Sequence, residues 1–287
     1  MTDAAESADG AGADTGGTAA GGTAAGTAAV VLADLRDEGE ELDGLVAGIQ
    51  AEDWALPSPA PRWTVAHQVA HLAWTDRQSL TALTDEAAFG RASQAALAEP
   101  GRFVDEGAER GAALPPAELL QQWRAGRAEL LRVLGQVPRG ARIPWYGPSM
   151  SAAGMATARI METWAHGEDV AEALGARREP TRRLRHVVRI GVRARDFAYA
   201  VRGLKPPAEE FRVELRGVDG ELWVHGPSDA AQRVTGDAVA FCRLVTQRLH
   251  PADADVSAEG PDAARWLEIA QAFAGPPGQG RPARSGS

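Results

Sequence analysis

The chain has 287 residues, of which 44% are hydrophobic, so it can bury a substantial core in one or two domains. The formal net charge is -9, and beyond the first 28 residues 35 acidic side chains stand against 30 basic ones, which argues against a nucleic-acid-binding surface. The single cysteine, Cys242, excludes an intrachain disulfide and a thiolate zinc cluster, and no apolar run approaches the ~18 residues of a membrane helix.

Both ends of the chain have the composition of disordered tails. Residues 1–28 consist mainly of Ala, Gly, Thr and Asp, with no large apolar side chain after Met1, and cannot offset their own ordering entropy. The first residues also lack the basic start and apolar stretch of a signal peptide, so we expect a cytoplasmic protein. Residues 276–287 are rich in Pro, Gly, Arg and Ser and are predicted to be disordered as well.

Helical periodicity dominates residues 29–203, which are predicted to form the first domain. Thr64 is a plausible N-cap for the second helix, and Pro115-Pro116 suits the first turn of a later one. Glu99-Pro100-Gly101 is predicted to be a turn. The predicted helices span residues 29–51, a segment beginning at Thr64, 84–97, a segment from Pro115 to the break at Pro138, 150–174 and 180–201.

The pattern changes after Gly203, and residues 204–275 are predicted to form a small second domain. Apolar and charged residues alternate over 211–216, and a turn followed by an extended run to His225 predicts a hairpin. The remaining predicted elements are short strands at 234–235 and 255–258 and helices at 238–249 and 262–274. The expected fold class is therefore mostly α, a helical domain followed by a small α+β domain.

A candidate metal site is suggested by Glu162 and His166, which lie four residues apart and therefore on one helix face. Such a pair can hold one divalent ion, or it can form a plain hydrogen bond. The second helix carries His67 and His71, and His71 with Glu162 and His166 would supply two nitrogens and one oxygen. Three protein ligands and an open position are typical of a catalytic zinc site, although imidazole also suits nickel or iron. His67 is a rival ligand.

Other residues are candidates for supporting roles. Asp169, one turn past His166, could orient a ligand imidazole, and Trp74, close to one turn past His71, could form a pocket wall, although capping or packing would explain both equally well. His67, Arg195 and Arg248 are candidates for contacts with a substrate. Cys242 lies in an apolar setting that is typical of a core position rather than a nucleophile.

The segments 63–73 and 162–170, together with 241–248 and 270–275, resemble the mycothiol-dependent maleylpyruvate isomerase family of the DinB-like metal-binding superfamily. The resemblance covers about residues 29–280. It implies a DinB-like four-helix bundle in which His71, Glu162 and His166 hold the metal, followed by a domain akin to sterol carrier proteins.

The family resemblance also implies chemistry. A divalent metal, zinc first, would hold the thiol of mycothiol as a thiolate, which would add to an electrophilic small-molecule substrate for isomerisation or S-transfer. Two alternatives stay open: a thiol-independent metal-dependent hydrolase, lyase or cyclase, and a non-enzymatic protein that binds a small ligand or a metal. The sequence does not indicate an oligomeric state.

Overall fold

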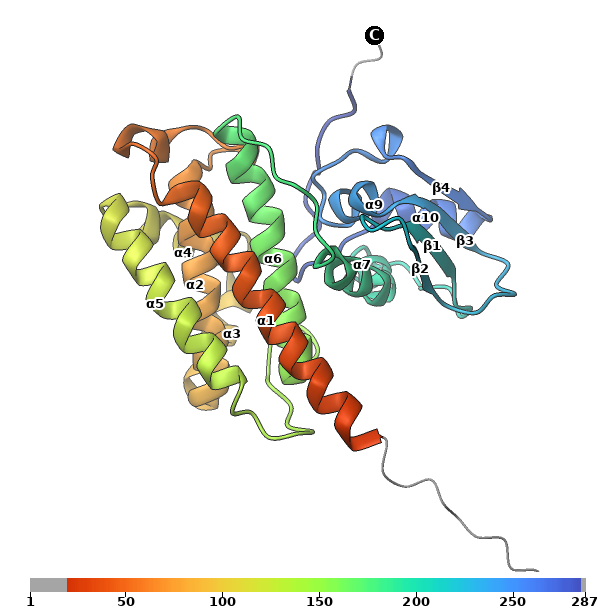
Figure 1. Ribbon diagram of the computed structural model, residues 1–287, viewed down its shortest axis with the longest axis horizontal. Helices are drawn as coiled ribbons and strands as arrows, with labels where there is room; N and C mark the ends of the chain where they lie inside the picture. Colours follow the sequence, from red (N-terminus) through yellow and green to blue (C-terminus); the bar gives the residue numbers. More distant parts are fainter. Residues whose placement is uncertain (1–19, 285–287) are drawn as a thin grey trace, which may run out of the picture.

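The computed structural model describes residues 20–284 and shows a helical bundle followed by a small sheet with its own helices (Figure 1). The predicted fold class is therefore confirmed. Among the described helices, none combines the length and the apolar character that a membrane crossing requires. The helices of the bundle are α1 (Ala20–Val46), α2 (Val65–Thr84), α3 (Glu86–Ala98), α4 (Pro100–Ala112), α5 (Pro116–Leu134) and α6 (Ala152–Ala173), and a short 3-10 helix (Ala51–Ala55) follows α1.

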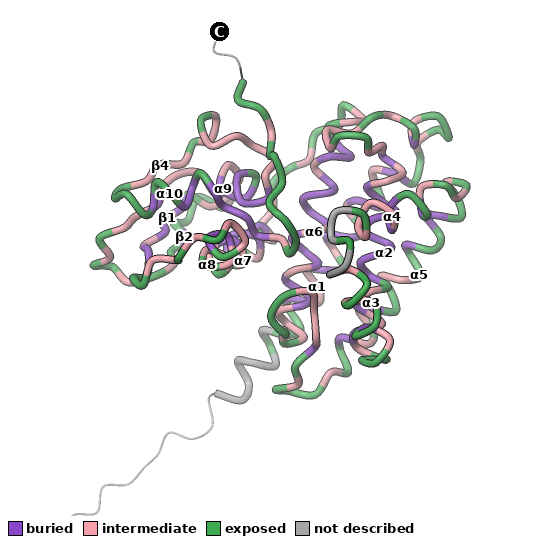
Figure 2. Tube along the Cα trace, turned by 180° about the vertical axis from the view of Figure 1, so that it is seen from behind, coloured by how far each residue is buried: buried purple, intermediate pink, exposed green. Residues whose placement is uncertain are grey.

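Helices α2 and α6 form the buried centre of the bundle. Helix α2 packs against α4, α5 and α6, and α1 packs against α6. Figure 2 shows buried residues along much of both central helices, as expected for elements that are covered on several sides. Ser151 caps α6 by accepting a hydrogen bond from the Gly154 N–H at 3.1 Å, so this helix begins next to the residues that were predicted to start it.

Helix α4 approaches α2 closely because two glycines face it. A Cβ atom at Gly107 would lie 2.7 Å from the Trp74 ring, and one at Gly111 would lie 2.7 Å from the Ala70 Cβ. The prediction of a turn at residues 99–101 was wrong, because α4 begins at Pro100. Proline is compatible with the first turn of a helix, where its missing N–H would have no intrahelical acceptor in any case.

We expect Gly107→Ala to destabilise the protein by about 1–3 kcal/mol, because the added methyl group would push Trp74 out of its packed position. The free energy of unfolding in urea measures this effect. Gly126→Ala on α5 is the matched control, since a Cβ there meets nothing within 4 Å. The control should gain up to ~1 kcal/mol from improved helix propensity, and equal effects at the two glycines would contradict close packing of α4 on α2.

The second domain contains a four-stranded sheet in the order β2-β1-β3-β4. The central pair β1–β3 is parallel, whereas β1–β2 and β3–β4 are antiparallel. The predicted hairpin is the β1–β2 pair. The elements are α7 (Leu184–Arg193), α8 (Arg195–Ala200), β1 (Arg212–Arg216), β2 (Leu222–His225), β3 (Arg233–Asp237), α9 (Ala238–Val245), β4 (Val256–Glu259) and α10 (Pro261–Ile269), with a short 3-10 helix (Pro251–Asp253) before β4.

The core of the second domain includes part of α6. Side chains from β1, β2 and β3 pack against α7, α9 and α10, and Trp266 is almost fully buried among them. Met161, Trp164 and Ala165 of α6 belong to this same cluster, although Glu162 and His166 of the same helix face the bundle. Helix α6 therefore contributes side chains to two hydrophobic cores.

Buried ion pairs fix residues 174–183, the segment between α6 and α7, against α1. Glu38 is 1% exposed, and its two carboxylate oxygens accept hydrogen bonds from Arg178 at 2.5 Å and from Arg183 at 2.6 Å. Arg178 also donates to the main-chain oxygen of Trp164 at 3.0 Å. The segment that follows α6 is thereby fixed both to α1 and to α6 before α7 begins.

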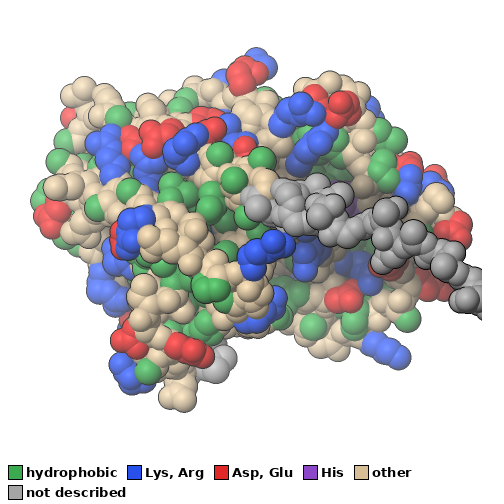
Figure 3. Space-filling model, turned by 60° about the horizontal axis from the view of Figure 1, so that its bottom comes forward, with side chains coloured by type: hydrophobic (Ala, Val, Ile, Leu, Met, Phe, Trp, Pro, Cys, Tyr) green, Lys and Arg blue, Asp and Glu red, His purple; other side chains and the backbone are tan. Residues whose placement is uncertain are grey.

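The chain ends differ from the predicted boundaries. The disorder predicted for residues 1–19 and 285–287 lies outside the described residues, but residues 20–28 belong to α1, which ends at Val46 rather than at residue 51. Residues 276–284 are not a free tail, because Arg281 donates to Asp169 at 2.9 Å and the Arg284 N–H donates to Asp253 at 2.8 Å. On the face drawn in Figure 3, acidic and basic side chains are interspersed.

Candidate metal centre

A polar seam runs between the two central helices of the bundle. Residue numbers rise along α2 as they fall along α6, so the two helices are antiparallel. Each rung of the seam joins one polar or sulfur-containing side chain from each helix. The rungs are Gln68–His166, His71–Glu162, Asp76–Arg159 and Ser79–Met155.

The three residues predicted to be ligands meet in this seam. Glu162 Oε2 lies 3.4 Å from His71 Nε2 and 3.2 Å from His166 Nε2, and the two imidazole centroids are 4.4 Å apart. One potential ligand atom from each residue lies within 4.8 Å of the other two. The imidazoles are nearly buried, whereas the Glu162 side chain is 20% exposed, so the group can be reached from solvent on the carboxylate side.

The protonation states suit a cation. Burial, reinforced by the nearby His71, lowers the pKa of the His166 imidazole to about 4. Burial alone would raise the pKa of Glu162, but the two histidines that lie against its carboxylate outweigh burial and leave this pKa well below its ordinary value. A neutral imidazole thus faces a carboxylate at neutral pH. Two imidazole nitrogens and one carboxylate oxygen are a donor set that fits zinc, nickel or iron.

Two tryptophans enclose the group. The Trp63 ring lies 5.3 Å from the His71 ring and 6.0 Å from the His166 ring, and the Trp74 ring lies 5.9 Å from the His71 ring. Asp105 of α4 holds Trp63 by accepting from its indole N–H at 3.2 Å. Trp74 thus lies beside His71, and its role as a pocket wall stays a prediction. Sequence reasoning missed Trp63, although its place directly before the N-cap of the histidine-bearing helix is a signal that could have pointed to it.

His67 does not join the three-residue group. Its Nδ1 lies 2.8 Å from the Thr64 hydroxyl oxygen and accepts from the Thr64 N–H at 3.3 Å, which makes it part of the N-terminal cap of α2. His67 is therefore engaged at the helix end, and the alternative that it replaces His71 as a ligand is wrong for this geometry. Its ring stacks on Trp63 at 6.4 Å, beside the group rather than within it.

Asp169 does not orient an imidazole as predicted. Its two carboxylate oxygens accept from Arg248 at 2.8 Å and from Arg281 at 2.9 Å, while His166 Nδ1 contacts Gln68. Arg248 also donates to the main-chain oxygens of Ala165 and Thr246, so its donors are occupied in joining the end of α9 to α6. Arg248, which was a candidate for contacts with a substrate, thus binds protein groups next to the candidate centre.

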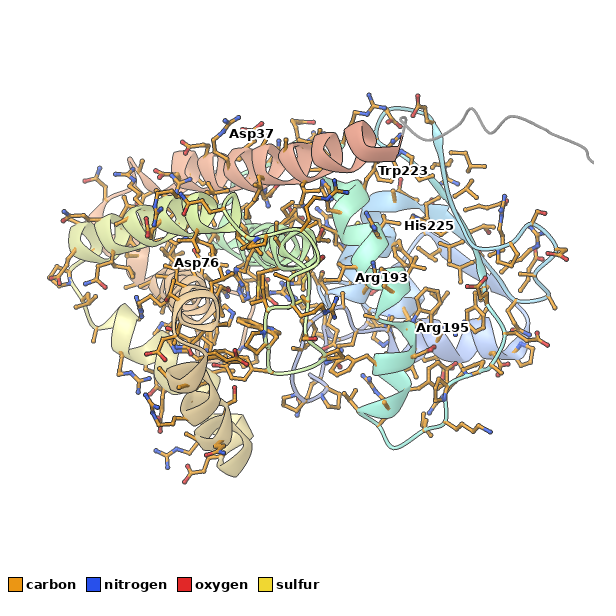
Figure 4. All side chains as sticks on the ribbon, turned by 90° about the horizontal axis from the view of Figure 1, so that it is seen from below. Asp37, Asp76, Arg193, Arg195, Trp223 and His225 are labelled. Atoms are coloured by element: carbon orange, nitrogen blue, oxygen red, sulfur yellow. The ribbon has the colours of Figure 1, made fainter. Side chains whose placement is uncertain are left out.

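Arg195 lies elsewhere. It belongs to α8 in the second domain, where Figure 4 shows it well apart from Asp76 of the bundle seam. Its guanidinium group donates to Asp196 and to the main-chain oxygens of Pro207 and Glu209, and it covers the ring of Phe211. These contacts explain Arg195 as a structural residue of the second domain and do not bring it to the candidate centre.

The sole cysteine should be inert in the folded protein. Cys242 is fully buried, and this burial raises the pKa of its thiol well above its ordinary value, so the reactive thiolate is suppressed. We expect no labelling by a maleimide or by Ellman's reagent under native conditions and one thiol per chain in denaturant. Rapid labelling of the native protein would show that α9 opens or that the packing around Cys242 is loose.

Comparisons with known proteins agree with the fold. Residues 35–171 match the family described as the mycothiol maleylpyruvate isomerase N-terminal domain. Two crystal structures, of the mycothiol-dependent maleylpyruvate isomerase and of a single-residue mutant of it, are similar with a TM-score of 0.55. They are 17% and 16% identical in sequence, and each match covers 82% of this chain and 95% of that protein, which supports a common fold.

Other relatives are closer in sequence. Two uncharacterized proteins of Mycobacterium tuberculosis, from two strains, are 60% identical over 250 residues, which is 87% of this chain and 97% of each relative. Residues 207–259 of the second domain match a family described as wyosine base formation, while the likeness of this domain to sterol carrier proteins stays a prediction. The chain belongs to the family of proteins that carry a mycothiol maleylpyruvate isomerase N-terminal domain.

Proposed function

We propose that this protein is a metal-dependent enzyme that uses a low-molecular-weight thiol, mycothiol, for the isomerisation of a small electrophilic substrate or for S-transfer to it. The observation that carries the proposal is the convergence of His71, Glu162 and His166 from two antiparallel helices at a point that solvent can reach. The match of residues 35–171 to the mycothiol maleylpyruvate isomerase N-terminal domain supports the thiol. Zinc is the first candidate for the metal, because a mixed nitrogen and oxygen set with an open position suits it.

The residues of the chain would divide the work. The metal, when bound, would supply Lewis acidity that keeps a thiol in its thiolate form at neutral pH. Glu162 provides the negative charge of the ligand set, and the two imidazoles provide neutral donors. Trp63 and Trp74 limit the access of water to the imidazole side, which strengthens electrostatic interactions there. Arg248 fixes the end of α9 against α6, so that the second domain forms part of the surroundings.

The proposal is tested by elemental analysis of freshly purified protein, followed by turnover assays with and without mycothiol. Maleylpyruvate is the first substrate to try, because it is the substrate named for the structural relatives. Isomerisation that requires both the metal and mycothiol would support the proposal. Turnover that is undiminished without the thiol would replace it by a thiol-independent hydrolase, lyase or cyclase. Binding of metal or ligand without turnover of any substrate would favour a binding protein.

A further inference from the structure

We infer that a hydrogen-bond relay from the proline-rich loop before α2 sets the tautomer of His166, with Gln68 as the positioning residue. The relay runs from the main-chain oxygen of Trp63 through Ser58 and Gln68 to His166 Nδ1. Its effect is to leave the lone pair of Nε2 directed at Glu162 and His71. The role of the relay in metal binding rests on the proposed function. The hydrogen bonds of the relay do not, because they involve protein groups only.

The first step follows from the chemistry of a carbonyl group, which can only accept. The Trp63 oxygen accepts from the Ser58 N–H at 2.8 Å and from the Ser58 hydroxyl at 2.9 Å. The loop is closed by these bonds and by an antiparallel bridge between Pro57 and Thr64. The Ser58 hydroxyl proton is therefore committed to Trp63, and the oxygen of this hydroxyl is free to accept.

The second step orients the amide of Gln68. Its Nε2 lies 2.8 Å from the Ser58 Oγ and donates to it, which directs Oε1 toward α6. Gln68 is fully buried, so solvent does not compete for either end of the amide. Turning the amide around would require the Ser58 hydroxyl to donate to Gln68, and the Trp63 oxygen would then lose one of its two partners.

The third step reaches the imidazole. Gln68 Oε1 lies 2.5 Å from His166 Nδ1, and an oxygen that can only accept requires the proton to be on Nδ1. In a neutral ring the other nitrogen, Nε2, then carries the lone pair. It lies 3.2 Å from a Glu162 oxygen, so two acceptors face each other where a cation would join them. An amide oxygen that accepts from a ligand histidine is a common way to fix the ring and to keep its donor nitrogen ready for a metal.

The other two histidines near the candidate metal centre, His67 and His71, lack this relay. The inference therefore applies to His166 alone. His71 Nδ1 is buried and has no hydrogen-bond partner among the described residues, so its tautomer is not imposed in the same way. His67 Nδ1 accepts from the Thr64 N–H, which places its proton on Nε2. The structure thus assigns opposite tautomers to His67 and His166.

Nuclear magnetic resonance of the metal-free full chain, labelled with ¹⁵N-histidine, tests the tautomer without any metal. Two-bond proton–nitrogen couplings should show the proton of His166 on Nδ1 and the proton of His67 on Nε2. Gln68→Met should convert His166 to a mixture of both forms, while Gln78→Met should not. Gln78 is the matched control because it lies on the same helix but accepts from Tyr146 instead of a ligand. Wild-type His166 with its proton on Nε2 would overturn the relay.

Metal affinity measured with zinc and cobalt(II) against a competing chelator tests the purpose. We expect Gln68→Met to lose about 10- to 100-fold in affinity, with Gln68→Glu restoring most of it because an acceptor oxygen remains. Ser58→Ala, which frees the amide to turn, should lose roughly fivefold, the value of one hydrogen bond. It also serves as the second variant if Gln68→Met fails to fold.

The outcomes separate the two proposals. If the wild-type chain binds neither metal, the proposed function fails. The relay is then tested only by the tautomers that nuclear magnetic resonance measures. If the wild-type chain binds metal and the folded Gln68 and Ser58 variants bind it within twofold of the wild type, the positioning role of Gln68 is wrong and the proposed function survives. Circular dichroism of each variant establishes that a loss of affinity is not a loss of fold.

Discussion

Replacing Glu162 by glutamine should reduce metal affinity by on the order of 100-fold or more, together with every activity that depends on the metal. The two side chains have nearly the same shape, so packing between α2 and α6 is preserved. The substitution removes the negative charge, and it presents an amide where a carboxylate oxygen lies 3.2 and 3.4 Å from the imidazole nitrogens. Loss of a direct ligand should cost at least as much as loss of a supporting hydrogen bond.

Metal content after dialysis and affinity by chelator competition measure this effect, and His71→Ala should reproduce it. Glu172→Gln is the matched control, because Glu172 lies on the same helix but faces solvent and pairs with Arg281. The control should keep wild-type affinity. If Glu162→Gln retained stoichiometric metal, the metal would have to be bound elsewhere, and the proposed function would lose its chemical basis.

Removing Asp76 alone should destabilise the protein by about 3–5 kcal/mol. Asp76 and Arg159 are 5% and 2% exposed, and they pair through the Arg159 Nε at 3.0 Å in the seam next to the candidate ligands. Burial raises the pKa of Asp76, while Arg159 opposes that shift, so this carboxylate depends on its arginine. Asp76→Ala would leave a guanidinium group without a partner in the middle of the bundle.

Urea denaturation of Asp76→Ala and of the double variant Asp76→Leu/Arg159→Met distinguishes a lost partner from lost packing. The double variant should recover most of the stability, because it removes both charges and keeps apolar volume. Glu268→Ala breaks the exposed Arg265–Glu268 pair of α10 and should cost less than ~1 kcal/mol. If the double variant were as unstable as the single one, the loss of stability would come from packing and not from the buried charge.

Local patterns were sufficient to predict most elements but not their ends. The helix predicted for residues 238–249 ends at Val245, because Gln247 has a φ of 61° and the Arg248 N–H returns to the Arg243 oxygen at 2.7 Å. This C-terminal cap usually has glycine at the position of Gln247, so no residue there signals the end of the helix. The start of α4 was missed in a similar way, because Pro100 was assigned to a turn although proline is compatible with the first turn of a helix.

The candidate ligands could be predicted because two of them share one helix face and the third belongs to a recognisable histidine pair. Their supporting residues divide into two kinds. Gln68 lies three residues before His71 on the same helix, so helical spacing could have identified it. The partners of Asp169 could not be found in this way, because Arg248 and Arg281 are separated from it by 79 and 112 residues and depend on the docking of the second domain.

Helix α6 places a double constraint on how this sequence can change over generations. Met161, Trp164 and Ala165 must suit the core of the second domain, while Glu162 and His166, interleaved with them, must suit the bundle. If recombination exchanged the second domain, the new domain would have to pack against the same three apolar side chains. Substitutions at positions 161, 164 and 165 should therefore co-vary with those in α7 and α9, and an exchange of the second domain alone should disrupt packing on α6.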